Sequence, residues 1–141
     1  MIINLIHDYM NPIELVKDFI SKISTQDVNG LADLMTEDHL FVDGMGTEVK
    51  GRETMRTGWA GYFRMVPDYR ITADKFFRDG VIVGIFGRAG GTYSRDGLLK
   101  PENRWEVPAA WLAEVSDNKI SHWQVFADNE PIRQIIEREQ Q

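Results

Sequence analysis

The sequence of 141 residues contains no cysteine, which excludes disulfide bonds, thiolate nucleophiles and thiolate metal sites. No apolar run approaches the ~20 residues that are needed to span a bilayer. Residues 1–10 carry Asp8 and no lysine or arginine ahead of their apolar stretch, unlike a secretory signal. We therefore expect a soluble, cytoplasmic protein without membrane contact.

Positive charge is also scarce, because 16 lysines and arginines face 22 acidic residues and the net charge is −6. The basic residues are interspersed with acids and form no basic face of the kind that binds nucleic acid, so no nucleic-acid partner is expected. The histidines (His7, His39 and His122) are scattered and lack metal-ligand spacing, so we predict neither a metal nor a cofactor. The length is typical of one domain over residues 1–141.

The first half of the chain shows helical periodicity. A first helix is predicted over 11–24, with Asn11 as its N-cap. A second, shorter helix begins after Asp27 and includes Met35 in its apolar stripe. A third helix over 52–66 ends before a proline. The apolar face of this third helix consists of Met55, Trp59, Tyr62 and Val66.

The second half changes to a period of two, which predicts β-strands. A short strand over 39–43 precedes the third helix, and longer strands are expected near 69–77, 81–93, 104–115 and 119–127. The pairs Asp79-Gly80 and Asp117-Asn118 are typical of hairpin turns, and a last helix is predicted over 132–137. Three helices followed by antiparallel hairpins indicate an α+β fold, with the helices packed on a strongly curved, mostly antiparallel sheet.

Two stretches resemble a known family. One joins a helix end, a strand, a turn and a helix-opening glycine, in Leu34-Met35-Thr36-Glu37-Asp38, Phe41-Val42-Asp43-Gly44-Met45-Gly46 and Lys50-Gly51-Arg52-Glu53. The other is Lys119-Ile120-Ser121-His122-Trp123-Gln124-Val125-Phe126-Ala127-Asp128-Asn129. With the order of elements over 11–136, they resemble the nuclear transport factor 2-like superfamily, which includes SnoaL-like and ketosteroid isomerase-like proteins. The resemblance implies a cone-shaped fold around a pocket for a small apolar molecule, and a homodimer through the outer sheet face.

Asp43 is the leading candidate for acid–base chemistry. Alternation along its strand puts His39, Phe41 and Asp43 on one face. The resemblance turns that face into the cone and matches Asp43 to the proton-abstracting aspartate of ketosteroid isomerases. Burial in an apolar pocket would raise the pKa of this carboxyl and suit it to proton transfer, with His39 and Tyr62 completing the catalytic set. The alternative is a turn in which Asp43 binds backbone N–H groups ahead of Gly44.

The expected ligand-lining residues are apolar or aromatic. By the resemblance, Phe19 and Ala110 stand where ketosteroid isomerase has its oxyanion-binding tyrosine and acid, so that reaction is not expected. The polar catalytic positions of limonene-epoxide hydrolases fall on Ile85, Gly87 and Val125, and the acid of SnoaL-like cyclases also falls on Val125. Ile85, Gly87 and Val125 carry no polar side-chain group and cannot perform those catalytic roles. The residues assigned to ligand binding are Phe19, Phe41, Trp59, Ala110, Trp123 and Val125. A wider aromatic lining is predicted from Trp59, Trp105, Trp111, Trp123, Tyr62, Tyr93, Phe41 and Phe86, and the alternative is that these side chains only pack the core.

Three classes of function remain open from the sequence. The chain is either a small isomerase, cyclase, hydratase or hydrolase that uses Asp43, or a non-catalytic protein that binds a small apolar molecule. The third class is a domain for dimerisation or partner contact. The substrate and the reaction do not follow from the residues, because one fold hosts many functions.

Overall fold

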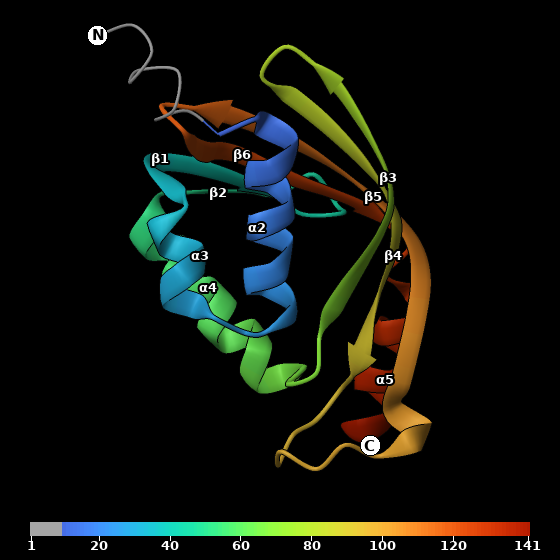
Figure 1. Ribbon diagram of the computed structural model, residues 1–141. Coiled ribbons are helices and arrows are strands. Elements are labelled where there is room, and N and C mark those ends of the chain that lie inside the picture. The colour runs from blue at the N-terminus through green and yellow to red at the C-terminus, as the bar shows by residue number, and fades with distance from the viewer. Residues whose placement is uncertain (1–9) are drawn as a thin grey trace, which may run out of the picture.

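The computed structural model describes residues 10–141; residues 1–9, which make up most of the stretch examined for a secretory signal, lie outside the described part. Three helices, α2 (Pro12–Ser24), α3 (Val28–Asp33) and α4 (Arg52–Met65), lie together on the concave side of a curved sheet (Figure 1). A further helix, α5 (Glu130–Glu139), follows the last strand. The predicted α+β arrangement is confirmed. Within residues 10–141, no helix has both the length and the apolar character needed to cross a membrane.

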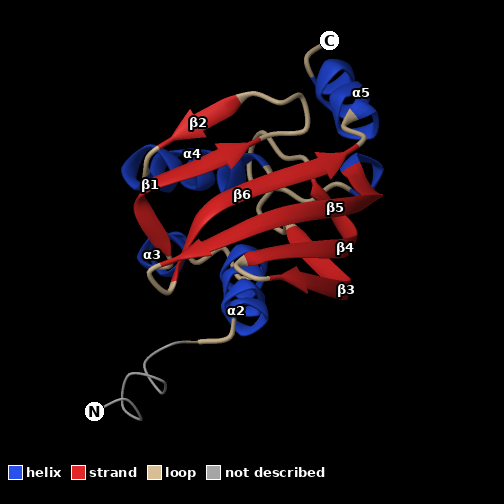
Figure 2. Cartoon of the chain, turned by 90° about the horizontal axis from the view of Figure 1, so that it is seen from above, coloured by secondary structure: helices blue, strands red, loops and turns tan. Residues whose placement is uncertain are grey.

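The sheet has six strands in the order β2-β1-β6-β5-β4-β3 (Figure 2). Their bounds are β1 (Met35–Val42), β2 (Glu48–Lys50), β3 (Arg70–Asp79), β4 (Ile82–Thr92), β5 (Arg104–Ser116) and β6 (Lys119–Ala127). Only β1 and β6 run parallel, and every other neighbouring pair is antiparallel. The sheet curls without closing, so that β2 and β3 remain as edges. A single 3-10 turn, η1 (Pro101–Asn103), interrupts the connection from β4 to β5.

The helix starts follow from local sequence. The Asn11 side chain accepts a hydrogen bond from the Ile13 amide at 2.8 Å, and Asp27 accepts one from the Gly30 amide at 2.9 Å. Both contacts satisfy N–H groups that have no partner within the helix. One face of α2 is then buried against the sheet, with Leu15, Val16, Phe19, Ile20 and Ile23.

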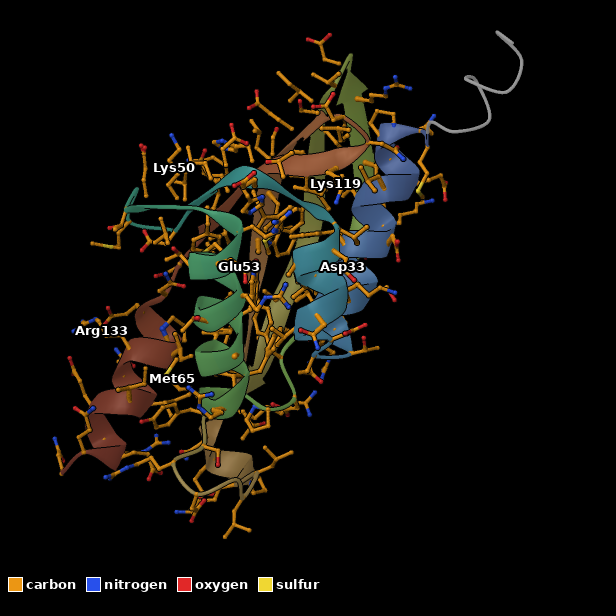
Figure 3. All side chains as sticks on the ribbon, turned by 90° about the vertical axis from the view of Figure 1, so that its left-hand side faces the viewer. Asp33, Lys50, Glu53, Met65, Lys119 and Arg133 are labelled. Atoms are coloured by element: carbon orange, nitrogen blue, oxygen red, sulfur yellow. The ribbon has the colours of Figure 1, made fainter. Side chains whose placement is uncertain are left out.

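The boundary between α3 and β1 differs from the prediction. Met35 was expected in the second helix, but α3 ends at Asp33 and Met35 begins β1. The physical reason is pairing with β6, since the Ile120 amide donates to the Leu34 carbonyl at 2.7 Å. The Lys119 ammonium also donates to the Asp33 carbonyl at 3.1 Å, and both residues are marked in Figure 3. The helical spacing that includes Met35 is therefore outweighed by pairing with β6, a strand that is distant in the sequence.

Tight turns and one backbone contact fix the lengths of the elements. Asp117 and Asn118 both have positive φ, as expected for a two-residue hairpin. The other hairpin turn uses Gly80 and Val81, one residue later than predicted. α4 runs from near Glu53 to Met65 (Figure 3), and the Met65 carbonyl accepts a hydrogen bond from the Ser94 amide at 2.8 Å, which joins α4 to the end of β4.

Candidate functional site

The inner face of the sheet is apolar and rich in tryptophan. Strand register places Phe41 beside Trp123, and Trp123 beside Ala113. The neighbouring row contains Val125 and Trp111. Alternate residues of β5 are buried on this face: Trp105, Val107, Ala109, Trp111 and Ala113. The predicted inner positions of Phe41, Trp123 and Val125 agree with this register.

Helix α4 provides an aromatic wall opposite the sheet. The Trp59 ring packs edge-on against Phe41, with centroids 6.1 Å apart, and stacks on Phe63 at 5.3 Å. Tyr62 meets Trp59 at 6.2 Å and Tyr69 at 5.0 Å, both edge-on. Aromatic side chains therefore connect β1 to the beginning of β3 across α4.

Two further aromatic contacts extend this interior. Tyr69 lies 6.2 Å from Trp105 of β5. On the α2 side, Phe19 packs against Trp123 at 4.9 Å, and Trp123 stacks on Trp111 at 6.4 Å. Phe19 thus lies inside the fold, as the predicted lining requires.

The phenol groups of Tyr62 and Tyr69 remain protonated at neutral pH. Burial raises the pKa of Tyr62 well above its ordinary value. Burial also raises the pKa of Tyr69, and the neighbouring Tyr62 adds to this shift. Both residues can therefore only donate or accept hydrogen bonds as neutral phenols, and neither acts as a base.

Unpartnered polar atoms lie within this apolar interior. Among the described residues, Trp59 Nε1, Trp105 Nε1 and His39 Nε2 are buried without a hydrogen-bond partner from the protein. Buried polar groups are nearly always paired, so such atoms are informative about binding. Trp105 belongs to the aromatic lining predicted from the sequence, whereas Tyr69 was not predicted to be part of it.

His39 is fully buried on the inner face of β1, beside Phe19. Its Nδ1 lies 2.7 Å from the carbonyl oxygen of Ile120. Burial is the largest influence on His39 and lowers its pKa, and the nearby His122 lowers it further. The hydrogen bond to Ile120 and the charge of Asp38 raise the pKa but do not offset the burial. The imidazole is therefore neutral at neutral pH.

Asp43 faces a turn. Its Oδ1 accepts hydrogen bonds from the amides of Met45 at 2.8 Å and Thr47 at 2.9 Å. This is the turn that the sequence offered as the alternative to a catalytic role. Neither hydrogen bond brings the carboxylate into contact with His39 or Tyr62. The sequence signal for it was the glycine that follows Asp43.

Ala110 lies on the other face of the sheet, which corrects its predicted place in the lining. It pairs with Phe86 of β4 and Phe126 of β6, both of which are half exposed on the outer surface. Phe86 was predicted to belong to the aromatic lining, and its position on the outer face corrects that prediction too. Ala109, one residue earlier, occupies the inner face. The segment is a strand, as predicted, but the alanine that faces the interior is Ala109 and not Ala110.

Cavities formed by the described residues also lie outside the aromatic interior. One of about 350 Å³ is lined by Ser94, Arg95, Asp96, Leu98, Lys100, Asn103 and Glu139. Polar contacts across it hold the last turn of α5: Arg95 donates to the Glu139 carbonyl, Asn103 donates to the Glu139 carboxylate, and Arg138 donates to Asn103 Oδ1. Another cavity, of about 640 Å³, is lined by Thr36, Glu37, Asp38, Lys50, Gly51, Ser116 and Asp117.

Known structures share this architecture. A hypothetical protein with a ketosteroid isomerase-like fold from Catenulispora acidiphila, solved in complex with trimethylamine, is 24% identical with a TM-score of 0.73; the match covers 84% of this chain and 88% of that one. An NTF2-like protein of unknown function from Cytophaga hutchinsonii is 18% identical with a TM-score of 0.70, covering 88% and 96%. An LEH-like epoxide hydrolase from M. tuberculosis is 16% identical with a TM-score of 0.73, covering 90% of each chain. At these identities, the likeness concerns the fold.

Sequence comparison gives the family. No curated protein matches the chain. The SnoaL-like domain matches residues 16–123, from the middle of α2 to the tryptophan of β6. This range includes the inner face of β5 and the whole of α4, which together form the aromatic interior. The chain belongs to the SnoaL-like domain family.

Proposed function

We propose that this SnoaL-like protein binds a small, mainly apolar molecule in the aromatic interior between α4 and the inner face of the sheet. The observation that carries the proposal is the pair of buried indole N–H groups, Trp59 Nε1 and Trp105 Nε1, that have no acceptor among residues 10–141. Ligand sites are usually apolar surfaces with a few such polar groups, which orient the ligand. An acceptor atom on the ligand would satisfy either indole.

The apolar character of the inner positions on β4 and β5 supports a binding role. The inner positions of β4 and β5 hold only apolar residues and glycine: Val83, Ile85, Gly87, Ala89, Gly91, Trp105, Val107, Ala109, Trp111 and Ala113. Asp43, which was expected to act as the base, bonds to turn amides. A carboxylate held in this way is stabilised in its turn and not positioned against an apolar ligand.

A neutral apolar dye tests the proposal. N-phenyl-1-naphthylamine should bind with a rise in its fluorescence, and Trp59→Leu should weaken its binding about tenfold, since an aromatic contact adds about 0.5–1.5 kcal/mol beyond its buried area. Phe77→Leu is the matched control, because Phe77 is 60% exposed. Absence of dye binding, or an equal loss in both variants, contradicts the proposal.

Catalysis by Asp43 is the second candidate; the fold neighbour named as an epoxide hydrolase shows that this fold can carry a reaction, although the positions predicted to match its polar catalytic residues hold Ile85, Gly87 and Val125 here. Asp43 would have to leave the Met45 and Thr47 amides and act as acid or base with His39 and Tyr62. Hydrolysis of styrene oxide, followed by chromatography, tests this role. If Asp43 is the base, Asp43→Asn abolishes turnover while the turn keeps its hydrogen bonds, since an amide oxygen accepts them equally well. Turnover that persists in this variant removes Asp43 from the mechanism.

We further propose that a second copy of the chain covers the outer sheet face. Phe77, Phe86 and Phe126 are at least half exposed there, and Phe77 and Phe86 contact each other edge-on. The nearby charges compensate one another, since Arg88 pairs with Asp74 and Glu106. A two-fold contact brings identical surfaces together, so a neutral apolar surface favours it.

Light scattering tests this dimer. We expect twice the chain mass of 16.2 kDa for the native protein, and the monomer mass for Phe86→Glu. Two glutamates would then face each other across the symmetric contact. Leu98→Glu is the control, because Leu98 is exposed on the β4–β5 connection. A native protein of monomer mass refutes the dimer.

A further inference from the structure

The hydrogen on the His39 ring is fixed by its neighbour. Nδ1 lies 2.7 Å from the Ile120 carbonyl oxygen, which can only accept a hydrogen bond. Nδ1 therefore carries the hydrogen and donates it. In the neutral ring, Nε2 then has a free lone pair and is an acceptor.

The ring stays neutral in its surroundings. The side chain is fully buried, with Phe19 6.2 Å away between ring centroids. The charged or titratable groups that act on it are Asp38, next to it on β1, and His122 on β6. Burial outweighs the favourable field of Asp38 and lowers the pKa of the imidazole.

The Nε2 acceptor is enclosed in the apolar core, where the His39 ring lies beside Phe19 and Phe19 packs on Trp123. No protein donor reaches it from the described residues. Phe41 follows on the same face of β1, and its ring contacts Trp59. A buried acceptor without a donor destabilises the folded state unless a bound group supplies the hydrogen.

We propose that His39 Nε2 accepts a hydrogen bond from the hydroxyl group of the ligand, which makes the ligand a neutral alcohol or phenol on an apolar frame. This rests on the proposed binding function. A carboxylate is disfavoured, because the lone pair of Nε2 would repel it and the inner positions of β4 and β5 contain no cation. The hydroxyl oxygen remains free to accept from an indole.

A pair of probes that differ in one hydrogen-bond donor tests the inference, since the second carries a methyl group in place of the hydroxyl hydrogen. Calorimetric titration at neutral pH compares 2-naphthol with 2-methoxynaphthalene, and 2-naphthoate serves as the anionic probe. The native protein should bind 2-naphthol about tenfold tighter than the ether, the effect of one neutral hydrogen bond, and should not bind the naphthoate measurably.

Two variants locate the acceptor. In His39→Asn, the amide nitrogen takes the position of Nδ1 and can keep the bond to the Ile120 carbonyl, but nothing replaces Nε2. The preference for 2-naphthol over the ether should then vanish. In His39→Gln, the amide reaches the position of Nε2, and part of the preference should return. Near-ultraviolet circular dichroism checks the packing of both variants.

The outcomes separate this inference from the proposed function. Equal affinity of the native protein for 2-naphthol and its ether overturns the role of His39 and leaves the binding function standing. Failure of both neutral probes to bind overturns both proposals. A preference that persists in His39→Asn places the acceptor elsewhere and overturns the inference. If a variant does not fold, the comparison in the native protein still decides.

Discussion

Gly87 is the position where an added methyl group should do most damage. It lies on β4 opposite Ala73, where the register between β3 and β4 shifts before Lys75. A Cβ at Gly87 would overlap the Thr72 carbonyl oxygen and lie 2.9 Å from the carbonyl carbon. Both atoms are backbone, so β3 must move to make room. We expect Gly87→Ala to lower the free energy of unfolding by about 3 kcal/mol, near the upper end for overpacking.

The matched control is Gly84→Ala on the same strand. There the nearest atoms to an added Cβ, from Phe77 and Phe86, lie 3.9 Å away, an ordinary contact. The alanine should leave stability unchanged or raise it by about 0.4–1 kcal/mol, since it restricts the unfolded chain. Urea unfolding followed by tryptophan fluorescence measures both variants. At a slope of roughly 2 kcal/mol/M, the Gly87 variant should unfold about 1.5 M earlier. Equal midpoints for the two variants refute the reasoning.

Three further perturbations concern the turn, the buried histidine and the last helix. Asp43→Ala should lower the melting temperature through the loss of two hydrogen bonds worth about 1–3 kcal/mol together, whereas Asp43→Asn should match the native protein; equal melting of all three contradicts the turn role. The folded state holds His39 with a lowered pKa, so the unfolded state binds more protons below pH 6.5. Stability should therefore fall as the pH drops from 6.5 to the folded pKa, by about 1.4 kcal/mol per unit of difference, and His39→Asn should abolish this contribution. Arg138→Ala should speed hydrogen exchange in α5 by removing its bonds to the Glu102 carbonyl and to Asn103; unchanged exchange contradicts an anchoring role.

Features encoded by neighbouring residues could be predicted from the sequence. The caps at Asn11 and Asp27 depend on contacts two or three residues away, and both are present. The turn at Asp117 and Asn118 is similarly local. The buried face of α4 was also predictable at Trp59, because helical spacing alone selects it.

Features that depend on distant partners were predicted less well. The local sequence predicts Met35 to be helical, but pairing of the adjoining backbone with β6 makes it the first residue of a strand. The face of the sheet on which Ala110 lies depends on its pairing with Phe126, and the sequence alone does not specify that register. The orientation of Asp43 was left open between two alternatives, since strand alternation points its carboxyl into the fold and turn chemistry points it at the backbone amides. The tautomer of His39 could not be predicted, because the Ile120 carbonyl that fixes it is 81 residues away.

Anchoring at its last turn makes α5 a candidate for a cooperative opening unit. Arg95, Asn103 and Arg138 hold the C-terminal end, while Ile132 and Ile135 bury the apolar side of the helix. A helix fixed at its far end frays little by single residues, so exchange of its amides should occur together and not progressively from the terminus. Opening of this unit would expose the buried isoleucines in one step.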